Sequence, residues 1–498
     1  MTLRELFQGI EMAVTRGPLD VEVTGLTYDS RRIRRGDVFF ALAGLRQDGG
    51  AFARQATAAG AVAVVGSDLD ATSPSAIQVA EPRRALAEAA ARFHHEPTAQ
   101  LRVVVVTGTN GKTTTTYMME SIFAAAGWSA GVIGTTGVRI AGEQRSGALT
   151  TPEAPELQAL LHEMVDRGVR AVAIELSSHA LVQRRGYRLD SDVAVFTNLS
   201  HDHLDYHGTI EAYLDAKLML FDGRNGDHAR RPWTAVVNAD DAAAPRVIEA
   251  AGRGGATIWT FGSSGGSTFR IAGVGTRPDG LDLRIEHEGS VQDVALGVLG
   301  RYNAWNATGA FAAARALGLA PDTAARGLAA MSDVPGRCER VDAGQSFTVL
   351  VDYAHTPDAL ARALAAVREH ANGRVLLVFG CGGERDRAKR PEMGRLAAAG
   401  SDDAWVTNDN PRREDPAAIA AEIVAGARAG SATRSALHVL LDRRQAIAAA
   451  LEAAGPGDTV LIAGKGHETT QTIGDRVLPF DDRQVARELL AVPGARSS

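Results

Sequence analysis

Residues 103–106 are four consecutive valines, and this unbroken apolar run predicts a buried strand. Strands in the interior of a parallel sheet are covered on both faces, so their side chains do not alternate between apolar and polar. A turn with two glycines follows at residues 107–111, and apolar residues at helical spacing then continue until Gly127. We therefore expect a strand, a tight turn and a helix, in that order.

The alternation of apolar runs and helical spacing continues along the chain. Strands are expected within residues 169–176 and 192–197, and four more begin the segments 347–358, 374–391, 403–412 and 458–471. Residues 1–98 alternate short strands with turn signals, and Pro97 interrupts the helical pattern before the valine run. The pattern predicts an α/β protein of three domains: a small N-terminal α/β domain (1–98), a central P-loop domain with a mostly parallel mononucleotide-binding sheet (99–334) and a C-terminal Rossmann-like α/β domain (335–498).

Composition narrows the classes of function without choosing one. The 498 residues carry a formal net charge of −6 and a pI near 6.1, which argues against a general nucleic-acid binder. The two cysteines, Cys338 and Cys381, are too few for a disulfide framework or a zinc site. No uncharged apolar run approaches about 20 residues, and charges interrupt the N-terminal segment. We expect a cytoplasmic protein with no membrane partner and no nucleic-acid partner.

The turn after the valine strand has the chemistry of a phosphate-binding loop. A strand that leads through glycines into a helix start presents backbone N–H groups and the positive end of a helix dipole to an anion. Lys112 adds a positive charge directly after Gly111, and the Thr113 hydroxyl can ligate Mg²⁺. The usual spacing, G-x-x-x-x-G-K-[ST], is not met, because position 106 is valine and the preceding glycine is Gly108. We predict a variant nucleoside-triphosphate loop; an ordinary strand-to-helix turn would not need this lysine and threonine.

Polar residues follow the next two predicted strands. Glu175 ends the first, where such folds place a partner of Mg²⁺. The second leads into a loop dense in His201, Asp202, His203, Asp205 and His207. This density indicates a metal or phosphate site; the alternative is a metal-dependent phosphohydrolase, but no second cluster follows to complete one. A helix is expected over residues 211–222, and its pattern alone favours a Lys217 side chain that reaches the surface.

Each of the four C-terminal strands ends in a polar loop. Open α/β sheets bind ligands outside the carboxyl ends of their strands, so a second ligand-binding face is expected here. A nucleotide site in one domain and a ligand face in another imply two substrates that domain closure brings together.

Several motifs, in order along nearly the whole chain, resemble those of the Mur ligases, the ATP-dependent amide-forming enzymes of peptidoglycan precursor synthesis. They are TGTNGKTT, ELSSHAL, NLSHDHLDYHG, YLDAKLMLF, VPGR, DYAHTPD and GKGHE. The DNPR stretch at residues 409–412 resembles the branch of the family that adds meso-diaminopimelate. The resemblance implies that the three domains bind UDP-sugar, ATP and amino acid, respectively. Only the residues after GKGHE depart from the family's usual pattern, and the glycine and glutamate of that motif remain.

The resemblance also implies a reaction. The substrate carboxylate attacks the γ-phosphate of ATP to give an acyl phosphate, which the incoming amine then attacks. Lys112, Lys217, Glu175 and His203 are the implied catalytic residues; Thr113, Glu175, His203 and Lys217 are the implied ligands of two Mg²⁺ ions. Lys217 is implied to be carbamylated by CO₂ (N6-carboxylysine), which needs a neutral amine on an apolar face. The implied ATP site comprises Gly108, Thr109, Asn110, Gly111, Lys112, Thr113, Thr114, Asn306, Arg337, Asp352 and His355.

The same resemblance assigns the two other substrates. UDP-N-acetylmuramoyl-L-alanyl-D-glutamate is implied to contact Ser30, Thr150, Thr151, Ser177, Gln183 and Arg185. meso-Diaminopimelate is implied to contact Arg385, Asp409, Asn410, Pro411, Arg412, Gly464 and Glu468. A guanidinium grips a carboxylate through two parallel hydrogen bonds, so Arg412 suits the carboxylate that distinguishes diaminopimelate from lysine, and Glu468 suits the distal ammonium.

Three other functions stay open from the sequence. A lysine-adding ligase of the same family is the near alternative. A folylpolyglutamate-synthase-like or cyanophycin-synthetase-like ligase shares the nucleotide core. Such ligases lack the pair formed by the N-terminal DSR motif (residues 29–31) and the C-terminal DNPR motif (residues 409–412). A nucleotide-dependent regulator without ligase activity is the alternative from another class. We expect a monomer that acts on small molecules.

Overall fold

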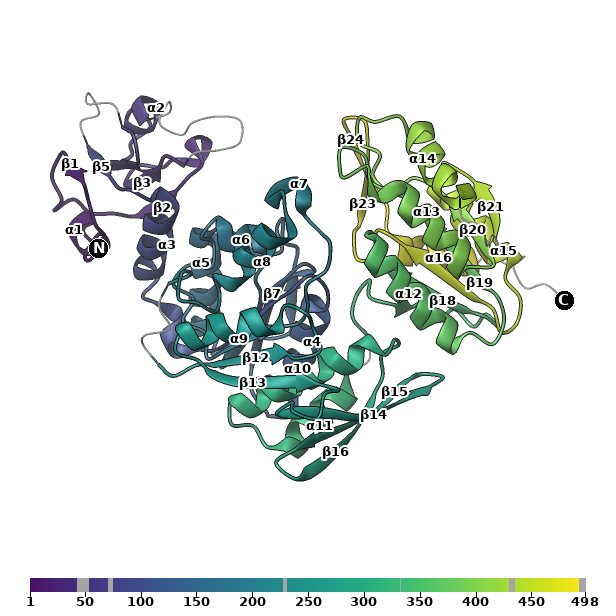
Figure 1. Ribbon diagram of the computed structural model, residues 1–498. Helices are drawn as coiled ribbons and strands as arrows, with labels where there is room; N and C mark the ends of the chain where they lie inside the picture. Colours follow the sequence, from purple (N-terminus) through teal and green to yellow (C-terminus); the bar gives the residue numbers. More distant parts are fainter. Residues whose placement is uncertain (43–52, 70–74, 227–230, 332, 430–434, 492–498) are drawn as a thin grey trace.

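The computed structural model describes residues 1–42, 53–69, 75–226, 231–331, 333–429 and 435–491 (Figure 1). Its strands form three larger sheets and one two-stranded sheet. The larger sheets take their strands from residues 14–78, 102–296 and 339–463, in that order along the chain. The protein is therefore α/β, as predicted, while the three domain ranges stay a prediction. Within the described residues no helix is both long and apolar enough to cross a membrane.

The N-terminal sheet has five strands in the order β1-β5-β4-β3-β2. Strands β2 to β5 pair in parallel, and β1 closes one edge antiparallel to β5. Phe7, Phe40, Val65 and Leu86 pack in one core between this sheet and its helices. The elements are α1 (Leu3–Leu6), β1 (Val14–Thr15), β2 (Gly25–Thr27), η1 (Ser30–Arg32), β3 (Asp37–Phe40), α2 (Ala53–Ala58), β4 (Ala63–Gly66), β5 (Ala76–Gln78) and α3 (Pro82–Phe93), followed by η3 (Pro97–Gln100).

The central sheet has eleven strands in the order β16-β15-β14-β13-β12-β11-β6-β10-β7-β8-β9. Neighbours from β7 to β14 are parallel, and antiparallel strands extend both edges. The strands are β6 (Arg102–Thr107), β7 (Ala130–Gly134), β8 (Gly137–Ile140), β9 (Glu143–Arg145), β10 (Ala171–Glu175), β11 (Val193–Phe196), β12 (Thr234–Asn238), β13 (Thr257–Gly262), β14 (Phe269–Arg277), β15 (Gly280–His287) and β16 (Ser290–Leu296). The mostly parallel sheet was predicted; the antiparallel edge β14–β16 was not.

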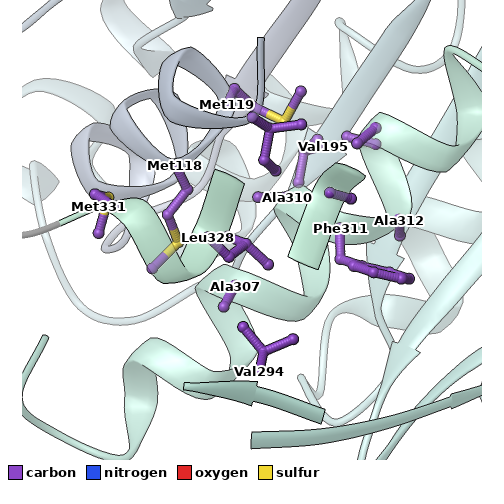
Figure 2. Close-up of a cluster of buried hydrophobic side chains, with 14 of the residues drawn as sticks. Met118, Met119, Val195, Val294, Ala307, Ala310, Phe311, Ala312, Leu328 and Met331 are labelled. Carbon is purple, nitrogen blue, oxygen red and sulfur yellow. The ribbon is translucent and has the colours of Figure 1, made fainter. Parts of the chain in front are cut away.

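The valine run occupies the middle of this sheet, and its side chains feed two separate cores. Val104 and Val106 lie in the core with α4, α10 and α11, while Val103 and Val105 lie in the core on the opposite face. Figure 2 shows the first core, where Met118 of α4 lies beside Leu328 of α11. All four valines are fully buried. Burial on both faces explains why this strand carries no alternating polar positions.

Helices connect the central strands. They are α4 (Lys112–Ala125), α5 (Ala154–Asp166), α6 (Ser178–Val182), α7 (Leu204–His207), α8 (Ile210–Leu218), α9 (Ala244–Arg253), α10 (Tyr302–Ala316) and α11 (Pro321–Ala330). The helix expected over residues 211–222 ends earlier, at Leu218. Its hydrogen bonds tighten there, since Leu220 N donates to Lys217 O and Phe221 N to Leu218 O.

The C-terminal sheet has the order β17-β18-β22-β19-β20-β21, and all its strands except β17 run parallel. Helices cover both faces, because separate cores contain α12–α14 on one side and α15–α16 on the other. The four predicted strands are β18 (Thr348–Asp352), β19 (Val375–Phe379), β20 (Asp403–Val406) and β22 (Thr459–Ala463). The other elements are β17 (Glu339–Arg340), α12 (Pro357–His370), α13 (Lys389–Gly400), α14 (Pro416–Ala429), β21 (Ala436–Val439), α15 (Arg443–Ala453), the hairpin β23 (Thr470–Ile473) and β24 (Arg476–Pro479), and α16 (Asp482–Ala491).

Candidate active site

The glycine-rich loop between β6 and α4 needs its two glycines for conformation and for space. Gly108 has φ +145° and Gly111 has φ +87°, values that favour glycine. A Cβ at Gly108 would overlap the Thr197 hydroxyl, and one at Gly111 would overlap the Asn306 side chain. Helix α4 then begins at Lys112. The loop therefore turns tightly and brings the N-terminus of a 14-residue helix to the surface of a cavity.

Lys112 folds back over this loop. Its Nζ donates to the carbonyl oxygens of Gly108 at 2.9 Å and Thr109 at 2.8 Å. Burial lowers the pKa of Lys112, while Glu175 and Asp202 act in the opposite direction. An anion held by the loop would offer this ammonium stronger, charge-assisted acceptors than two carbonyls.

The loop opens into a cavity of about 540 Å³ between the central and C-terminal sheets. Most of the implied nucleotide and metal residues line it: Thr109, Asn110, Gly111, Lys112, Thr113, Thr114, Glu175, His203, Asn306, Arg337, Asp352 and His355. Thr150 and Ser177, assigned to the UDP substrate, line it as well. Gly108 and Lys217 are not among its lining residues. The structure thus brings residues of the central sheet region and residues 334–363 together around one cavity.

Glu175 is held at the end of β10 by the neighbouring strand connection. Its Oε1 accepts from the Thr135 backbone N–H at 2.9 Å, and its Oε2 accepts from the Thr135 hydroxyl at 2.9 Å. The Thr135 hydroxyl also lies 3.2 Å from that of Thr150. The carboxylate is only 1% exposed, so these contacts fix its direction at the cavity wall.

His203 lies at the mouth of the cavity in a left-handed conformation, with φ +53°. Its Nε2 is 3.4 Å from Asp202 Oδ2, and 43% of its side chain is exposed. The protein that packs around the rest of the ring lowers its pKa to about 4. A neutral imidazole is the form that ligates metals.

Lys217 is buried, contrary to the expectation from the pattern. Its side chain is 1% exposed; Nζ donates to Gly108 O at 2.9 Å and lies 4.2 Å from the centre of the Tyr213 ring. The side chain of Lys217 therefore ends against the loop and does not reach the surface. Burial, and next to it the charge of Lys112, lowers the pKa of Lys217 well below its usual value. The Lys217 amine is therefore neutral more readily than the amine of an exposed lysine.

The donor set fits Mg²⁺ bound together with phosphate, rather than a cage made by the protein alone. Thr113 and Glu175 offer oxygen atoms on one cavity wall, and His203 lies on the same cavity. Across the described ranges no three His, Cys, Asp or Glu side chains converge as a metal cluster. Mg²⁺ commonly takes one or two protein ligands and completes its shell with waters and substrate phosphates.

The C-terminal part of the chain reaches the loop directly. Arg337 Nη2 donates to the Thr113 hydroxyl at 3.3 Å, and its guanidinium stacks 4.8 Å from the Tyr353 ring centre. Asp358, in the first turn of α12, accepts from Asn110 Nδ2 at 2.9 Å and from the Ser200 hydroxyl at 3.0 Å. These contacts tie the loop to the sheet that carries the second ligand face.

Three further residues of the implied nucleotide site make contacts within the protein itself. Asp352 accepts from the Cys338 backbone N–H at 2.7 Å, beside the connection between the two sheets. His355 Nδ1 lies 2.7 Å from Tyr353 O, and burial lowers the pKa of this histidine. Asn306 donates to Asn303 Oδ1 at 2.8 Å, one turn earlier in α10.

The residues assigned to the UDP substrate form a chain of contacts, with one exception. Thr151 accepts from Ser177 N at 3.3 Å, and its carbonyl accepts from Arg185 Nη1 at 3.1 Å. Arg185 Nη2 donates to Gln183 Oε1 at 2.6 Å, and its Nε is 3.0 Å from Glu153. Ser30 lies apart from them, in η1 of the N-terminal sheet.

Contacts to α5 bring that N-terminal region close to the central sheet. Tyr28 donates to Glu156 Oε1 at 3.1 Å, and Arg83 pairs with Glu153 at 3.2 Å. A second cavity of about 700 Å³ is lined by residues 24–28, 31–35, Asp37 and Glu156, and Ser30 is not among its lining residues. It contains Arg31, Arg32, Arg34 and Arg35, so its charge suits an anionic ligand.

The residues assigned to the amino acid gather at the carboxyl ends of β19, β20 and β22. A Cβ at Gly464 would meet the Asp409 carboxylate, and one at Gly382 would lie 3.1 Å from Arg412 Nη1. Arg412 Nη1 donates to Gly383 O at 2.7 Å. Pro411 belongs to the same loop, and Arg385 is exposed beside it. These residues therefore lie near one another at one edge of the C-terminal sheet, and their binding of a ligand stays a prediction.

Glu468 is joined to the loop at residues 409–412 through Asn410, and Lys465 holds the same carboxylate oxygen. Its Oε2 accepts from Asn410 Nδ2 at 2.9 Å and from Lys465 Nζ at 3.0 Å. Lys465 was not singled out from the sequence, and neither were Thr135, Asp358 or Asn198, whose Oδ1 accepts from the loop N–H of Asn110. Each of these acts through contacts with residues distant in sequence. Only the position of Lys465 inside GKGHE could have drawn attention to it.

Comparison with protein families identifies three stretches of the chain. Residues 22–94 match the model described as Mur ligase family, catalytic domain. Residues 106–314 match the Mur ligase middle domain, and residues 336–466 match the Mur ligase, glutamate ligase domain.

Curated relatives match almost the full length. A UDP-N-acetylmuramoyl-L-alanyl-D-glutamate–2,6-diaminopimelate ligase of Syntrophomonas wolfei is 42% identical, over 98% of this chain and 99% of the relative. Proteins of the same name from Geobacillus thermodenitrificans (44% identical, 94% of each chain) and Streptomyces avermitilis (43% identical, 96% of this chain and 95% of the relative) also match.

Solved structures agree with these matches. A structure of a UDP-N-acetylmuramoyl-L-alanyl-D-glutamate–2,6-diaminopimelate ligase has a TM-score of 0.71 and 33% identity, with 98% of both chains covered. A MurF ligase of Thermotoga maritima in complex with ADP has a TM-score of 0.61 at 21% identity, covering 94% of this chain and 96% of its own. Mycobacterium tuberculosis folylpolyglutamate synthase has a TM-score of 0.64 at 20% identity, covering 82% and 95%. The last two show the shared fold alone.

Proposed function

The chain belongs to the Mur ligase family, and from this premise we propose that it joins meso-2,6-diaminopimelate to UDP-N-acetylmuramoyl-L-alanyl-D-glutamate at the expense of ATP. The observation that carries the proposal is the full-length similarity to diaminopimelate ligases at 42–44% identity. The structure supports it with a cavity lined by the phosphate loop, by Asp352, which ends β18 of the C-terminal sheet, and by His355, which follows that strand. We place this reaction in cytoplasmic peptidoglycan precursor synthesis and propose a monomeric enzyme.

The chemistry follows from the partners in that cavity. A carboxylate oxygen of the D-glutamate side chain attacks the γ-phosphorus of ATP, and ADP leaves. The diaminopimelate amine then attacks the acyl carbon, the C–O bond to phosphate breaks, and the amine loses a proton. The protein has little covalent work to do; it holds reactants and neutralises charge. Lys112, the N–H groups of the loop and Arg337 are the groups of this chain placed to do so.

Mg²⁺, when bound with ATP, neutralises phosphate charge and lowers the repulsion between the phosphate and the attacking carboxylate. We propose Thr113, Glu175, His203 and carbamylated Lys217 as the protein ligands of two such ions. Carbamylation joins the Lys217 nitrogen to the carbon of CO₂ and releases one proton. The lowered pKa of Lys217 supports this step, because only the neutral amine has the free electron pair that attacks CO₂.

We propose that the N-terminal domain (1–98) binds the UDP-sugar, the central domain (99–334) ATP and the C-terminal domain (335–498) the amino acid. Ser30 and the arginine-lined cavity near it serve the anionic UDP end, and Thr150, Thr151, Ser177, Gln183 and Arg185 serve the sugar-peptide end. Asn306, Asp352 and His355 stand around the nucleotide.

Specificity for diaminopimelate rests on the C-terminal face. Arg412 pairs with the second carboxylate, which lysine lacks, and Glu468 with the distal ammonium. Lysine would leave a partly buried guanidinium without its partner, which costs more than one lost contact. The L-lysine-adding activity is the alternative that the fold alone would allow.

The test is amide formation by the purified protein. Mass spectrometry follows the product from UDP-N-acetylmuramoyl-L-alanyl-D-glutamate and ATP, with meso-diaminopimelate or L-lysine supplied separately. We expect ATP-dependent product with diaminopimelate. Product with L-lysine in its place overturns the specificity, and no product with either amino acid overturns the ligase assignment.

A further inference from the structure

Lysine is rare in this chain and occurs where the sites lie. Only four of the 53 lysine and arginine residues are lysine: Lys112, Lys217, Lys389 and Lys465. Lys112 and Lys217 meet at the Gly108 carbonyl, and Lys389 donates to His355 O at 2.7 Å. An ammonium is a compact charge with three donors, whereas a guanidinium is a planar fork. The fourth lysine, Lys465, lies near the residues assigned to the amino acid.

Lys465 is completely buried and uses all three of its donors. Its Nζ donates to Thr470 O at 2.6 Å, Glu468 Oε2 at 3.0 Å and Asn410 Oδ1 at 3.4 Å. Asn410 also donates to Glu468 Oε2 at 2.9 Å. Lys465, Glu468 and Asn410 therefore form a closed triangle of hydrogen bonds between two loops.

One oxygen of the Glu468 carboxylate takes no part in this triangle. Both donors meet Glu468 at Oε2, and no donor in the described ranges reaches Oε1. The Glu468 side chain is 31% exposed, while that of Lys465 is 0% exposed. One carboxylate oxygen is thus anchored to the protein, and the other remains available for a ligand outside.

Other buried polar groups join the same two loops through the backbone. Arg443 pairs with Asp482 at 2.7 Å and donates to Asn408 O at 3.2 Å and Ala463 O at 3.0 Å. Gln471 donates to Asp409 O at 2.8 Å. Asn410 Oδ1 also accepts from the Thr472 backbone N–H at 2.9 Å. These contacts already hold the backbones and the Asn410 amide, so the distinct contribution of Lys465 is to the Glu468 carboxylate.

We infer that Lys465 is a positioning residue for the amino-acid substrate, because its buried ammonium holds the Glu468 carboxylate against the Asn410 amide. The inference rests on the proposed function, in which Glu468 and Asn410 contact diaminopimelate. Without Lys465 the Glu468 carboxylate loses its strongest anchor, and the amino acid must order it upon binding. The ATP loop and the UDP end lie outside the triangle and keep their contacts.

Steady-state kinetics of the full-length enzyme test this inference, with KM measured separately for diaminopimelate, ATP and the UDP substrate. We expect Lys465→Met to raise the KM for diaminopimelate at least about tenfold and to change the other two less than about twofold. Lys465→Arg should not restore the wild-type KM, because a planar guanidinium does not fit a site that holds a compact ammonium. Arg413→Ala is the matched control: its ion pair with Asp475 lies on the same loops but is largely exposed.

A double-mutant cycle separates positioning from a general structural effect. If Lys465 acts through Glu468, the KM of Lys465→Met/Glu468→Gln equals that of the worse single variant rather than the product of both effects. Thermal unfolding checks that each variant folds, and Lys465→Gln, which keeps a donor for Thr470 O, replaces Lys465→Met if that variant does not.

Three results overturn the inference: an unchanged KM for diaminopimelate in a folded Lys465 variant, an equal rise in all three KM values, or multiplicative effects in the cycle. Failure of the proposed function looks different. A wild-type enzyme that makes no product with diaminopimelate overturns that function before any variant is compared.

Discussion

Replacing Lys217 by methionine should separate activity from stability. Methionine keeps an unbranched, apolar side chain of similar length against the Tyr213 ring, where sulfur packs well. The change removes the hydrogen bond from Nζ to Gly108 O, worth about 1 kcal/mol. Gly108 O is not left without a donor, because Lys112 Nζ also reaches it. Burial of the Lys217 amine is itself unfavourable, so its removal offsets the loss of this hydrogen bond. We expect a change in unfolding free energy within about 1 kcal/mol.

Turnover should respond far more strongly. A carbamate at Lys217 supplies charge where phosphate transfer is neutralised, and loss of one such group costs about 10²–10³-fold in kcat. Denaturant unfolding and the rate of ATP-dependent product formation measure the two effects on the same preparations. Glu211→Gln, at an exposed position in the first turn of the same helix, is the control and should match the wild type in both.

Labelled bicarbonate links the loss to the modification itself. The wild-type protein should show the NMR signal of a carbamate carbon, and the methionine variant should not. A variant with near-normal turnover would refute the role of Lys217. A loss of several kcal/mol in stability would show instead that the lysine is needed to hold the loop.

Three other expectations follow, two from residues described above and one from His179 of α6, whose ring packs against those of His203 and Tyr206. Arg412→Lys should raise the KM for diaminopimelate at least about tenfold and leave that for ATP within about twofold, as measured by initial rates; equal rises would indicate a structural role. Asp358→Ala removes the acceptor of Asn110 and Ser200, so ATP should bind about five- to tenfold more weakly by calorimetry, and unchanged affinity would show that the contact does not shape the loop. Burial lowers the pKa of His179 to about 4, so the unfolded state binds more protons between that pH and its ordinary value near 6.5; unfolding free energy should therefore rise with pH in this window, and His179→Gln should flatten the slope.

The phosphate loop could be predicted from the sequence because its determinants are local. Four valines, two glycines and the Lys112-Thr113 pair determine a strand, a turn and a helix start within a dozen residues. The four strand ends of the C-terminal sheet are equally local, and parallel pairing then gathers them at one edge. Local pattern alone indicated Lys112, Thr113, Glu175 and the polar loops after the strands, whereas the other candidate residues came from the resemblance to Mur ligases.

Packing and long-range contacts could not be predicted in the same way. The burial of Lys217 depends on the loop above it, which is more than a hundred residues away in sequence. Asp358 meets Asn110 across 248 residues, and no periodicity encodes such a pair. Apart from its position in GKGHE, Lys465 has the sequence pattern of an ordinary loop lysine, and the three hydrogen bonds of its buried ammonium are seen only in the structure.

Competition between the two amino acids tests the central claim most directly. The enzyme receives UDP-N-acetylmuramoyl-L-alanyl-D-glutamate, ATP and equal concentrations of meso-diaminopimelate and L-lysine, and mass spectrometry identifies the product. We predict that the diaminopimelate adduct exceeds the lysine adduct by at least about a hundredfold, because the Arg412 site is left unpaired by lysine. Comparable amounts of both products, or an excess of the lysine adduct, would contradict the account.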